Sequence, residues 1–186
     1  MTVPPFGELI AATTRTAVHL ETRDAYTPDD PVFLDWKAGR PVSAPAGVSW
    51  YELVREHTAR GVEFRRARIV SEPLADYTRF EFASTSFNVA AGESVRWLPR
   101  HTAPGLVVPL CDFWVFDGRL VRFGFFAGDG TFLGHEMAED PEVVARCADA
   151  FERVWERAVP HGDYRPALFQ PCPSHHRPAS SVPVSS

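Results

Sequence analysis

Arginine residues recur in two segments whose composition predicts β-strands, residues 64–70 and 94–98. Because side chains alternate between the two faces of a strand, Arg66 and Arg68 lie on the same face of the first segment. Arg96 belongs to the second segment and reaches the same site if the two strands are neighbours. Guanidinium groups gathered in this way bind carboxylates or phosphates, so a small anionic ligand is one expectation. A solvated strand face, or ion pairs within the chain, is the more common outcome of such a pattern.

Asp112 and Trp114 alternate with Phe113 and Val115 in another expected strand. If Phe113 and Val115 face the core, the opposite face presents a tryptophan beside an acid, as protein interfaces often do. A strand that is buried on both faces is the alternative. The residues that we expect to bind a ligand or a partner are Arg66, Arg68, Tyr77, Arg96, Asp112, Trp114 and Asp129.

Motifs for nucleophilic or metal chemistry are missing from the sequence. No Gly-x-Ser-x-Gly elbow and no Gly-rich phosphate loop occur. The carboxylate of Asp112 beside Cys111 would raise the pKa of that thiol and weaken it as a nucleophile. Cys172, His175 and His176 have zinc-binding atoms, but no fourth ligand lies near them in the sequence. We therefore expect neither a metal nor a cofactor.

The N-terminal third predicts helices and loops. Apolar residues from Phe6 onward keep a helical spacing, and the apolar stripe continues less regularly as far as Leu20. Asp30 followed by Pro31 is typical of an N-cap and the first position of a short helix. We therefore expect a helical N-terminal region.

The region from Cys111 to Glu136 shows the clearest strand pattern. Asp117-Gly118 between two apolar runs predicts a hairpin, because the turn requires positive φ angles. A second turn at residues 128–130 leads into a third strand, so three antiparallel strands are expected.

Two further segments predict helices. Residues 74–88 have helical spacing but strand-like composition, and we favour a helix there without excluding a strand. Asp140 and Pro141 open a segment with one continuous apolar face, which Pro160 ends. The expected fold is α/β, a single domain with a mixed, partly antiparallel sheet flanked by helices. That domain spans residues 1–170, and a disordered Pro/Ser-rich tail spans residues 171–186.

The stretch from Leu110 to Phe125 weakly resembles the strand motif His-x-Lys-x4-Asp of phospholipase-D-type phosphodiesterases. The Asp-Gly pair at 117–118 and Gly124 match, but Leu110, Asp112 and Phe125 stand where the family has His, Lys and Ser. The resemblance implies a half-domain of that fold without its catalytic set. One functional alternative is therefore a small-molecule-sensing domain with Arg66 or Arg68 and Asp112 at the mouth of a pocket.

A resemblance over residues 6–166 is more specific. The strings ESVRWLPR, DFWVFD and AFERVWERAVPHGDYRP are similar to an uncharacterised family of small proteins from GC-rich Gram-positive soil bacteria. Members are often encoded beside a helix-turn-helix regulator, which implies a protein partner of that kind and no assigned activity. The family pattern Asn-His-Phe-Asp-Gly-Asp-Gly is altered at residues 124, 125 and 127, which puts any site there in doubt.

The composition limits the classes of partner and the cell compartment that we expect for this chain. The formal net charge of −5 disfavours a protein that holds nucleic acid by its phosphates, so we expect no direct nucleic-acid contact. Three widely spaced cysteines fit reduced thiols in a cytoplasmic protein. No apolar run is long enough to cross a membrane, and no signal peptide is visible.

Together these patterns favour a non-enzymatic protein-interaction or regulatory module that acts with a helix-turn-helix regulator. The sensing domain on a degenerate phospholipase-D-like fold is the first alternative. The second is an unrecognised hydrolase whose residues meet only in the fold. The first residues to test for that possibility are Asp24, His101, Asp112, Asp117 and His135.

Overall fold

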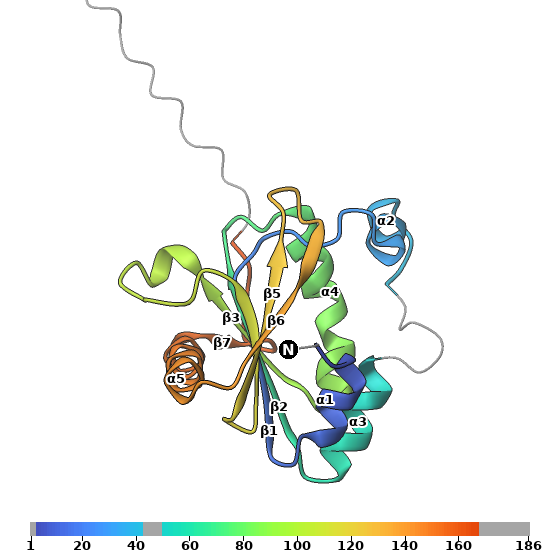
Figure 1. Cartoon of the computed structure of the whole chain (residues 1–186). Coiled ribbons are helices and arrows are strands. Elements are labelled where there is room, and N and C mark those ends of the chain that lie inside the picture. The colour runs from blue at the N-terminus through green and yellow to red at the C-terminus, as the bar shows by residue number, and fades with distance from the viewer. Residues whose placement is uncertain (1–2, 43–49, 168–186) are drawn as a thin grey trace, which may run out of the picture.

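A seven-stranded mixed sheet forms the centre of the computed structural model, which describes residues 3–42 and 50–167 (Figure 1). The strands are β1 (Thr16–Glu21), β2 (Glu63–Val70), β3 (Ser94–Pro99), β4 (Asp112–Phe116), β5 (Leu120–Phe126), β6 (Phe132–Ala138) and β7 (Val159–Pro160). Their order in the sheet is β6-β5-β4-β1-β2-β3-β7. Strands β1, β2 and β3 are parallel, whereas β4, β5 and β6 form an antiparallel meander. The expected α/β fold with a mixed, partly antiparallel sheet is confirmed.

Helices cover both faces of this sheet. They are α1 (Phe6–Ala12), α2 (Pro31–Lys37), α3 (Trp50–Ala59), α4 (Asp76–Ala91) and α5 (Pro141–Arg157), with a short 3-10 turn, η1 (Arg100–Thr102). Helix α5 lies on one side of the sheet, and α1, α3 and α4 lie on the other (Figure 1). Asp30 and Asp140 cap α2 and α5 through their side chains, as the Asp-Pro pairs predict. None of the described helices combines the length and the apolar character that a membrane span requires.

The face of the sheet under α5 is apolar. Phe113 and Val121 on the sheet pack against Phe151 and Val154 of α5, and all four side chains are fully buried or nearly so. On the opposite face, a second cluster joins α1 and α3 to the N-terminal ends of β1 and β2. That opposite face becomes polar toward the carboxyl ends of the same strands, where the candidate site lies.

The expected helical N-terminal region begins as a helix, but the less regular apolar stripe that continues to Leu20 belongs to a strand. Helix α1 ends at Ala12, and the chain then enters β1, a central strand of the sheet. Both faces of β1 are covered, so its apolar residues do not follow the simple alternation that marks a half-exposed strand. The carboxylate of Asp117 holds the start of β1 by accepting hydrogen bonds from the backbone N–H groups of residues 14–16, at 2.8–3.0 Å.

Residues 74–88 belong to a helix, which runs from Asp76 to Ala91. Gly92 ends it with a φ of 106°, a conformation that glycine adopts without strain. The expected third strand of the meander is β6, which runs from Phe132 to Ala138 after the turn at residues 128–130. The expected tail, residues 171–186, lies outside the described residues, and the proposed domain boundary stays a prediction.

Candidate functional site

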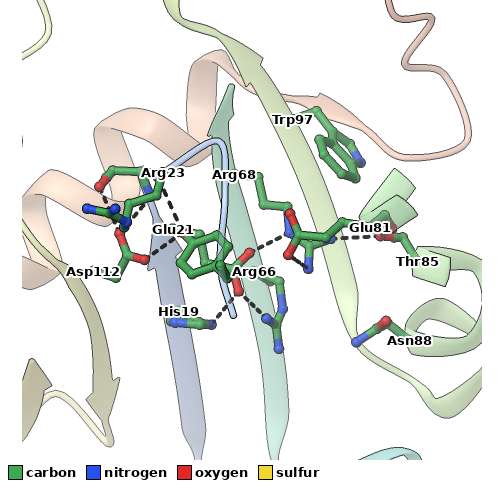
Figure 2. A network of polar contacts seen from close by, with 12 residues as sticks. His19, Glu21, Arg23, Arg66, Arg68, Glu81, Thr85, Asn88, Trp97 and Asp112 are labelled. Carbon is green, nitrogen blue, oxygen red and sulfur yellow. Dashed lines mark hydrogen bonds and ion pairs between the residues drawn. The ribbon is translucent and has the colours of Figure 1, made fainter. Parts of the chain in front are cut away.

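Charged side chains line the sheet face beneath α4. Glu21 of β1 lies beside Arg68 of β2 in the parallel register, and His19 lies beside Arg66. Figure 2 shows these four side chains pointing to the same side of the sheet. Strand alternation thus places Arg66 and Arg68 together, as the sequence predicts.

Both arginines are engaged by carboxylates of the same chain. Glu21 accepts hydrogen bonds from Arg66 and from Arg68. The Nε of Arg66 also donates to Glu93 at 2.7 Å, and Arg68 lies 3.2 Å from a carboxylate oxygen of Glu81. All five side chains are buried. Because their charges are met inside the protein, these contacts do not offer the two guanidinium groups to an anionic ligand.

The charge state of this network follows from the pKa values of its acids. Burial opposes ionisation of Glu21, yet the adjacent Arg66 and Arg68 hold the pKa of its carboxyl well below the usual range. Burial raises the pKa of Glu81 to about 8, because Arg68 offsets only part of the desolvation. Near neutral pH, Glu81 is therefore largely protonated, and Glu21 and Glu93 balance the two arginines.

A cavity of about 170 Å³ lies at the end of this network, between β1 and the meander. Its walls combine aromatic rings with a few polar groups, which is the usual composition of small-molecule sites. The lining residues are His19, Glu21, Tyr26, Asp112, Phe113, Trp114, Arg122, Gly124, Phe126 and His135. Of the sequence-predicted site residues, only Asp112 and Trp114 line this cavity.

Asp112 is a buried carboxylate that is held by neutral donors. One of its oxygens accepts hydrogen bonds from the backbone N–H and the hydroxyl of Thr22, at 2.8 and 2.7 Å. The other oxygen accepts a 2.5 Å hydrogen bond from the hydroxyl of Tyr26. Burial raises the pKa of Asp112, and these donors offset part of that effect. Among the described residues, no cation forms an ion pair with Asp112.

Arg122 is the cation of this cavity. Its guanidinium donates to Nδ1 of His135 at 3.1 Å and lies 4.9 Å from the centre of the Phe6 ring. Its Nε is buried without a hydrogen-bond partner, and no carboxylate among the described residues forms an ion pair with Arg122. Burial lowers the pKa of His135, and the Arg122 charge lowers it further, so this imidazole is neutral and accepts the hydrogen bond.

The cross-strand register places the charged side chains of Asp112 and Arg122 on the same face of the sheet. Asp112 pairs with Gly124, and Trp114 pairs with Arg122. Gly124 keeps the space between them open: a Cβ there would lie 3.4 Å from the ring of Phe126 and 3.9 Å from His135. Trp114 stacks on His19 with ring centres 4.1 Å apart. Of the two alternatives for this strand, the structure favours the one that is covered on both faces, because the ring of Trp114 is half-buried beneath α1 and α3.

The other predicted site residues lie elsewhere. Arg96 projects to the opposite face, where it donates to the backbone oxygen of Trp155 at 2.9 Å. It therefore does not join Arg66 and Arg68, although its strand neighbours theirs. Tyr77 lies with Arg66 and Arg68 in the lining of a second cavity, of about 310 Å³, beside the charged network. Asp129 sits in an exposed turn, where its carboxylate accepts from the backbone N–H of Thr131 at 2.9 Å.

The five residues named for a possible hydrolase do not converge. Asp24 accepts hydrogen bonds from Ser71, Asp117 holds β1, and His101 is exposed. Asp112 and His135 alone among them line the cavity. Within residues 3–42 and 50–167, no three His, Cys, Asp or Glu side chains are placed to hold a metal ion. The cysteine and histidines of residues 172–176 lie outside that part of the chain.

Comparisons with known proteins now identify the family. A family model described as a domain of unknown function, DUF6879, matches residues 4–166. The chain belongs to the DUF6879 family. The resemblance to an uncharacterised family is thus confirmed, while its expected source organisms and gene neighbourhood stay predictions. No curated protein matches this sequence.

One similar solved structure is that of TrmBL2, described as an archaeal chromatin protein with a novel mode of DNA binding. It shares 13% sequence identity at a TM-score of 0.46, and the match covers 82% of this chain and 47% of that one. The chain thus spans about half the length of that protein. The expectation that this DUF6879 protein makes no direct contact with nucleic acid finds no support in this comparison, because the similar structure is described as that of a DNA-binding protein; the description is of TrmBL2 alone. The phospholipase-D-like relationship stays a prediction.

Proposed function

We propose that this DUF6879 protein is a binding module for a small polar molecule, which occupies the cavity between Asp112 and Arg122. A ligand-sensing domain with Arg66 or Arg68 at the pocket is one of the alternatives expected from the sequence. Here the arginine that binds the ligand is Arg122 instead. The proposal agrees with the regulatory role expected from the sequence, with the molecule bound in the cavity as the regulatory signal.

The buried Nε of Arg122, which has no hydrogen-bond partner, carries the proposal. A buried donor without an acceptor costs roughly 1–3 kcal/mol, and more when the group is charged. Most buried polar groups in native proteins therefore have a partner, and an exception in a cavity indicates a binding role. An acceptor atom of a ligand beside Nε of Arg122 would remove that cost.

The cavity walls support binding rather than catalysis. No Ser, Thr, Cys or Lys is among the residues that line it, so a nucleophile of these four types is missing there. Asp112 is engaged on both oxygens, and Nδ1 of His135 accepts from Arg122. Groups that are held in this way orient a ligand well and transfer protons poorly.

Ligand-observed NMR with a library of small polar fragments tests the proposal. Gly124→Val fills the cavity, and Gly105→Val adds the same side chain at a position where a Cβ meets no atom within 4 Å. We expect fragments to bind the unaltered chain and the Gly105 variant, and not the Gly124 variant. Fragments that bind all three proteins alike, or none that bind at millimolar concentration, would overturn the proposal. Melting curves confirm that each variant is folded.

Protein interaction is a second candidate function, and the edge of the sheet favours it. Strand β6 pairs with β5 on one side and with no described strand on the other. Phe132 and Leu133 at its start are 44% and 67% exposed. An open edge with apolar side chains accepts a strand from another chain. The partner expected from the family resemblance is a helix-turn-helix regulator.

A pull-down from the native cell with the tagged chain tests this second function. Leu133→Lys places a charge on the β6 edge, and Leu34→Lys does the same on the exposed side of α2. A stoichiometric helix-turn-helix protein that is lost with the Leu133 variant and kept with the Leu34 variant supports it. Recovery of the bait alone, or of the same protein with both variants, contradicts it.

A further inference from the structure

We propose that the ligand of this cavity is a zwitterion, with an acidic group bound by Arg122 and an ammonium group bound by Asp112. The inference rests on the proposed function and adds the chemical class of the ligand. An amino acid, or an amino-acid-sized molecule with both charges, fits this description.

The first observation is that the cavity holds two opposite charges that do not pair with each other. Asp112 and Arg122 come from adjacent antiparallel strands and face the same side of the sheet. Each side chain contacts other groups instead. Asp112 accepts hydrogen bonds from Thr22 and Tyr26, and Arg122 contacts His135 and the ring of Phe6. Gly124 lies directly opposite Asp112 and two residues from Arg122 on β5, and it contributes no side chain. The two charges are thus held apart across a gap.

The second observation is that both groups retain hydrogen-bonding capacity. A carboxylate has about four lone-pair sites, and the described contacts of Asp112 use three of them. A guanidinium has five N–H donors, and the buried Nε of Arg122 uses none of its own. An ammonium group at Asp112 and an acidic group at Arg122 would form charge-assisted hydrogen bonds, which are stronger than those between neutral groups.

The third observation is the charge balance of the walls. Glu21 also lines the cavity, but Arg66 and Arg68 neutralise it. Burial holds the pKa of His19 well below its usual value, so that imidazole adds no positive charge. The remaining charges are those of Asp112 and Arg122. A ligand with one charge leaves the other charged group of the cavity uncompensated, whereas a zwitterion compensates both.

The size and the aromatic walls limit the ligand further. A cavity of about 170 Å³ is smaller than the usual range for drug-sized ligands, so a molecule of few atoms is expected. The rings of Trp114, Phe126 and Tyr26 line the same space and favour an apolar body between the two charged ends.

Calorimetric titration with matched probes tests the inference on the unaltered chain. In the series glycine, β-alanine and γ-aminobutyrate, the distance between the carboxylate and the ammonium group increases. Leucine adds an apolar side chain to the first of these spacings. Butyrate and butylamine each keep one end of γ-aminobutyrate. We expect at least one zwitterion to bind. Its singly charged counterpart, matched in the same way, should bind roughly ten- to a hundred-fold more weakly, because one charged hydrogen-bonded contact is lost.

Two variants assign the ends of the ligand. Arg122→Gln should reduce the affinity for the zwitterion and for its acid-only analogue. Asp112→Asn should reduce the affinity for the zwitterion and leave that for the acid-only analogue unchanged. If Asp112→Asn fails to fold, Tyr26→Phe, which removes one donor to Asp112, takes its place as a milder change. In that variant the affinity for the zwitterion should change, while the affinity for the acid-only analogue should stay the same.

The outcomes separate this inference from the function on which it rests. If acid-only or neutral fragments bind as tightly as the zwitterions, and Gly124→Val abolishes their binding, the cavity is a ligand site and the zwitterion inference is wrong. If no probe and no library fragment responds to Gly124→Val, both proposals fail. Binding of a zwitterion that persists in Gly124→Val also overturns the inference, because the ligand then lies outside the cavity.

Discussion

The two faces of the sheet differ in how they are stabilised. Under α5, the sheet presents an apolar surface, and the helix meets it with an apolar stripe. Under α4, the sheet presents Arg66 and Arg68, and the helix meets them with Glu81 and Thr85. Burial of apolar area holds the first face together, and fully paired charges hold the second.

This difference shows why the site lies where it does. Apolar packing tolerates replacements of similar volume, whereas buried charges require specific partners in specific directions. The polar network positions Glu21 and the strands on which the cavity groups stand. The apolar face supplies stability without placing any polar group at the site. We therefore expect substitutions on the two faces to differ in size and in pH dependence.

Breaking the polar network should have the largest effect. Glu21→Ala leaves Arg66 and Arg68 without the carboxylate that they share, and an uncompensated buried charge costs about 3–5 kcal/mol. Urea denaturation near neutral pH measures the change in the free energy of unfolding. Glu142→Ala is the matched control, because that glutamate pairs with an arginine on the exposed side of α5. It should cost less than about 0.5 kcal/mol. Equal losses in the two variants would contradict the proposed division between the faces.

The same difference explains which helices the sequence predicts. Asp140 and an apolar stripe identify α5, because an apolar sheet face demands an apolar helix face. Helix α4 buries Thr78, Glu81, Thr85 and Asn88, which recur at helical spacing but are polar. The apolar residues of positions 74–88 therefore show only part of the helical pattern, and the strand-like composition leaves a strand possible there. Buried polar stripes become visible only when their partners on the sheet are known.

The candidate site was partly accessible from the sequence. Asp112 and Trp114 were identified from strand alternation, but Arg122 was missed because its place depends on the hairpin register. A two-residue Asp-Gly loop would place Phe116 opposite Arg119, whereas the structure pairs Phe116 with Leu120. That longer loop brings Arg122 opposite Trp114. An arginine two residues before a glycine in an otherwise apolar strand was the available signal.

A second prediction concerns pH, and its effect should be smaller. Burial raises the pKa of Glu81 in the folded chain to about 8, above the ordinary value of 4.5. The folded state therefore binds more protons than the unfolded state between these values, and stability falls as pH rises from 4.5 to 8. Glu81→Gln keeps an acceptor for Arg68 without this loss. It should be more stable than the unaltered chain at pH 9, and the difference should shrink at pH 5.

Urea denaturation across this pH range measures the effect. Glu152→Gln is the control, because that carboxylate pairs with Arg65 at the surface rather than within the network. Its stability should follow that of the unaltered chain at every pH. A Glu81 variant that also follows the unaltered chain would show that Glu81 is ionised throughout, and that the network carries one more negative charge than inferred here.

The smallest effect is expected on the apolar side, at the start of α5. The carboxylate of Asp140 accepts hydrogen bonds from the backbone N–H groups of Glu142 and Val143, at 2.8 and 3.1 Å. Asp140→Ala removes this cap and should cost about 1 kcal/mol. Asp140→Ser restores a capping oxygen and should recover most of the loss. Thermal unfolding near neutral pH measures both variants. Because α5 packs on the face away from the cavity, neither variant should change the affinity for a fragment that binds there. A loss of ligand affinity in Asp140→Ala, with the fold intact, would show that the two faces are coupled.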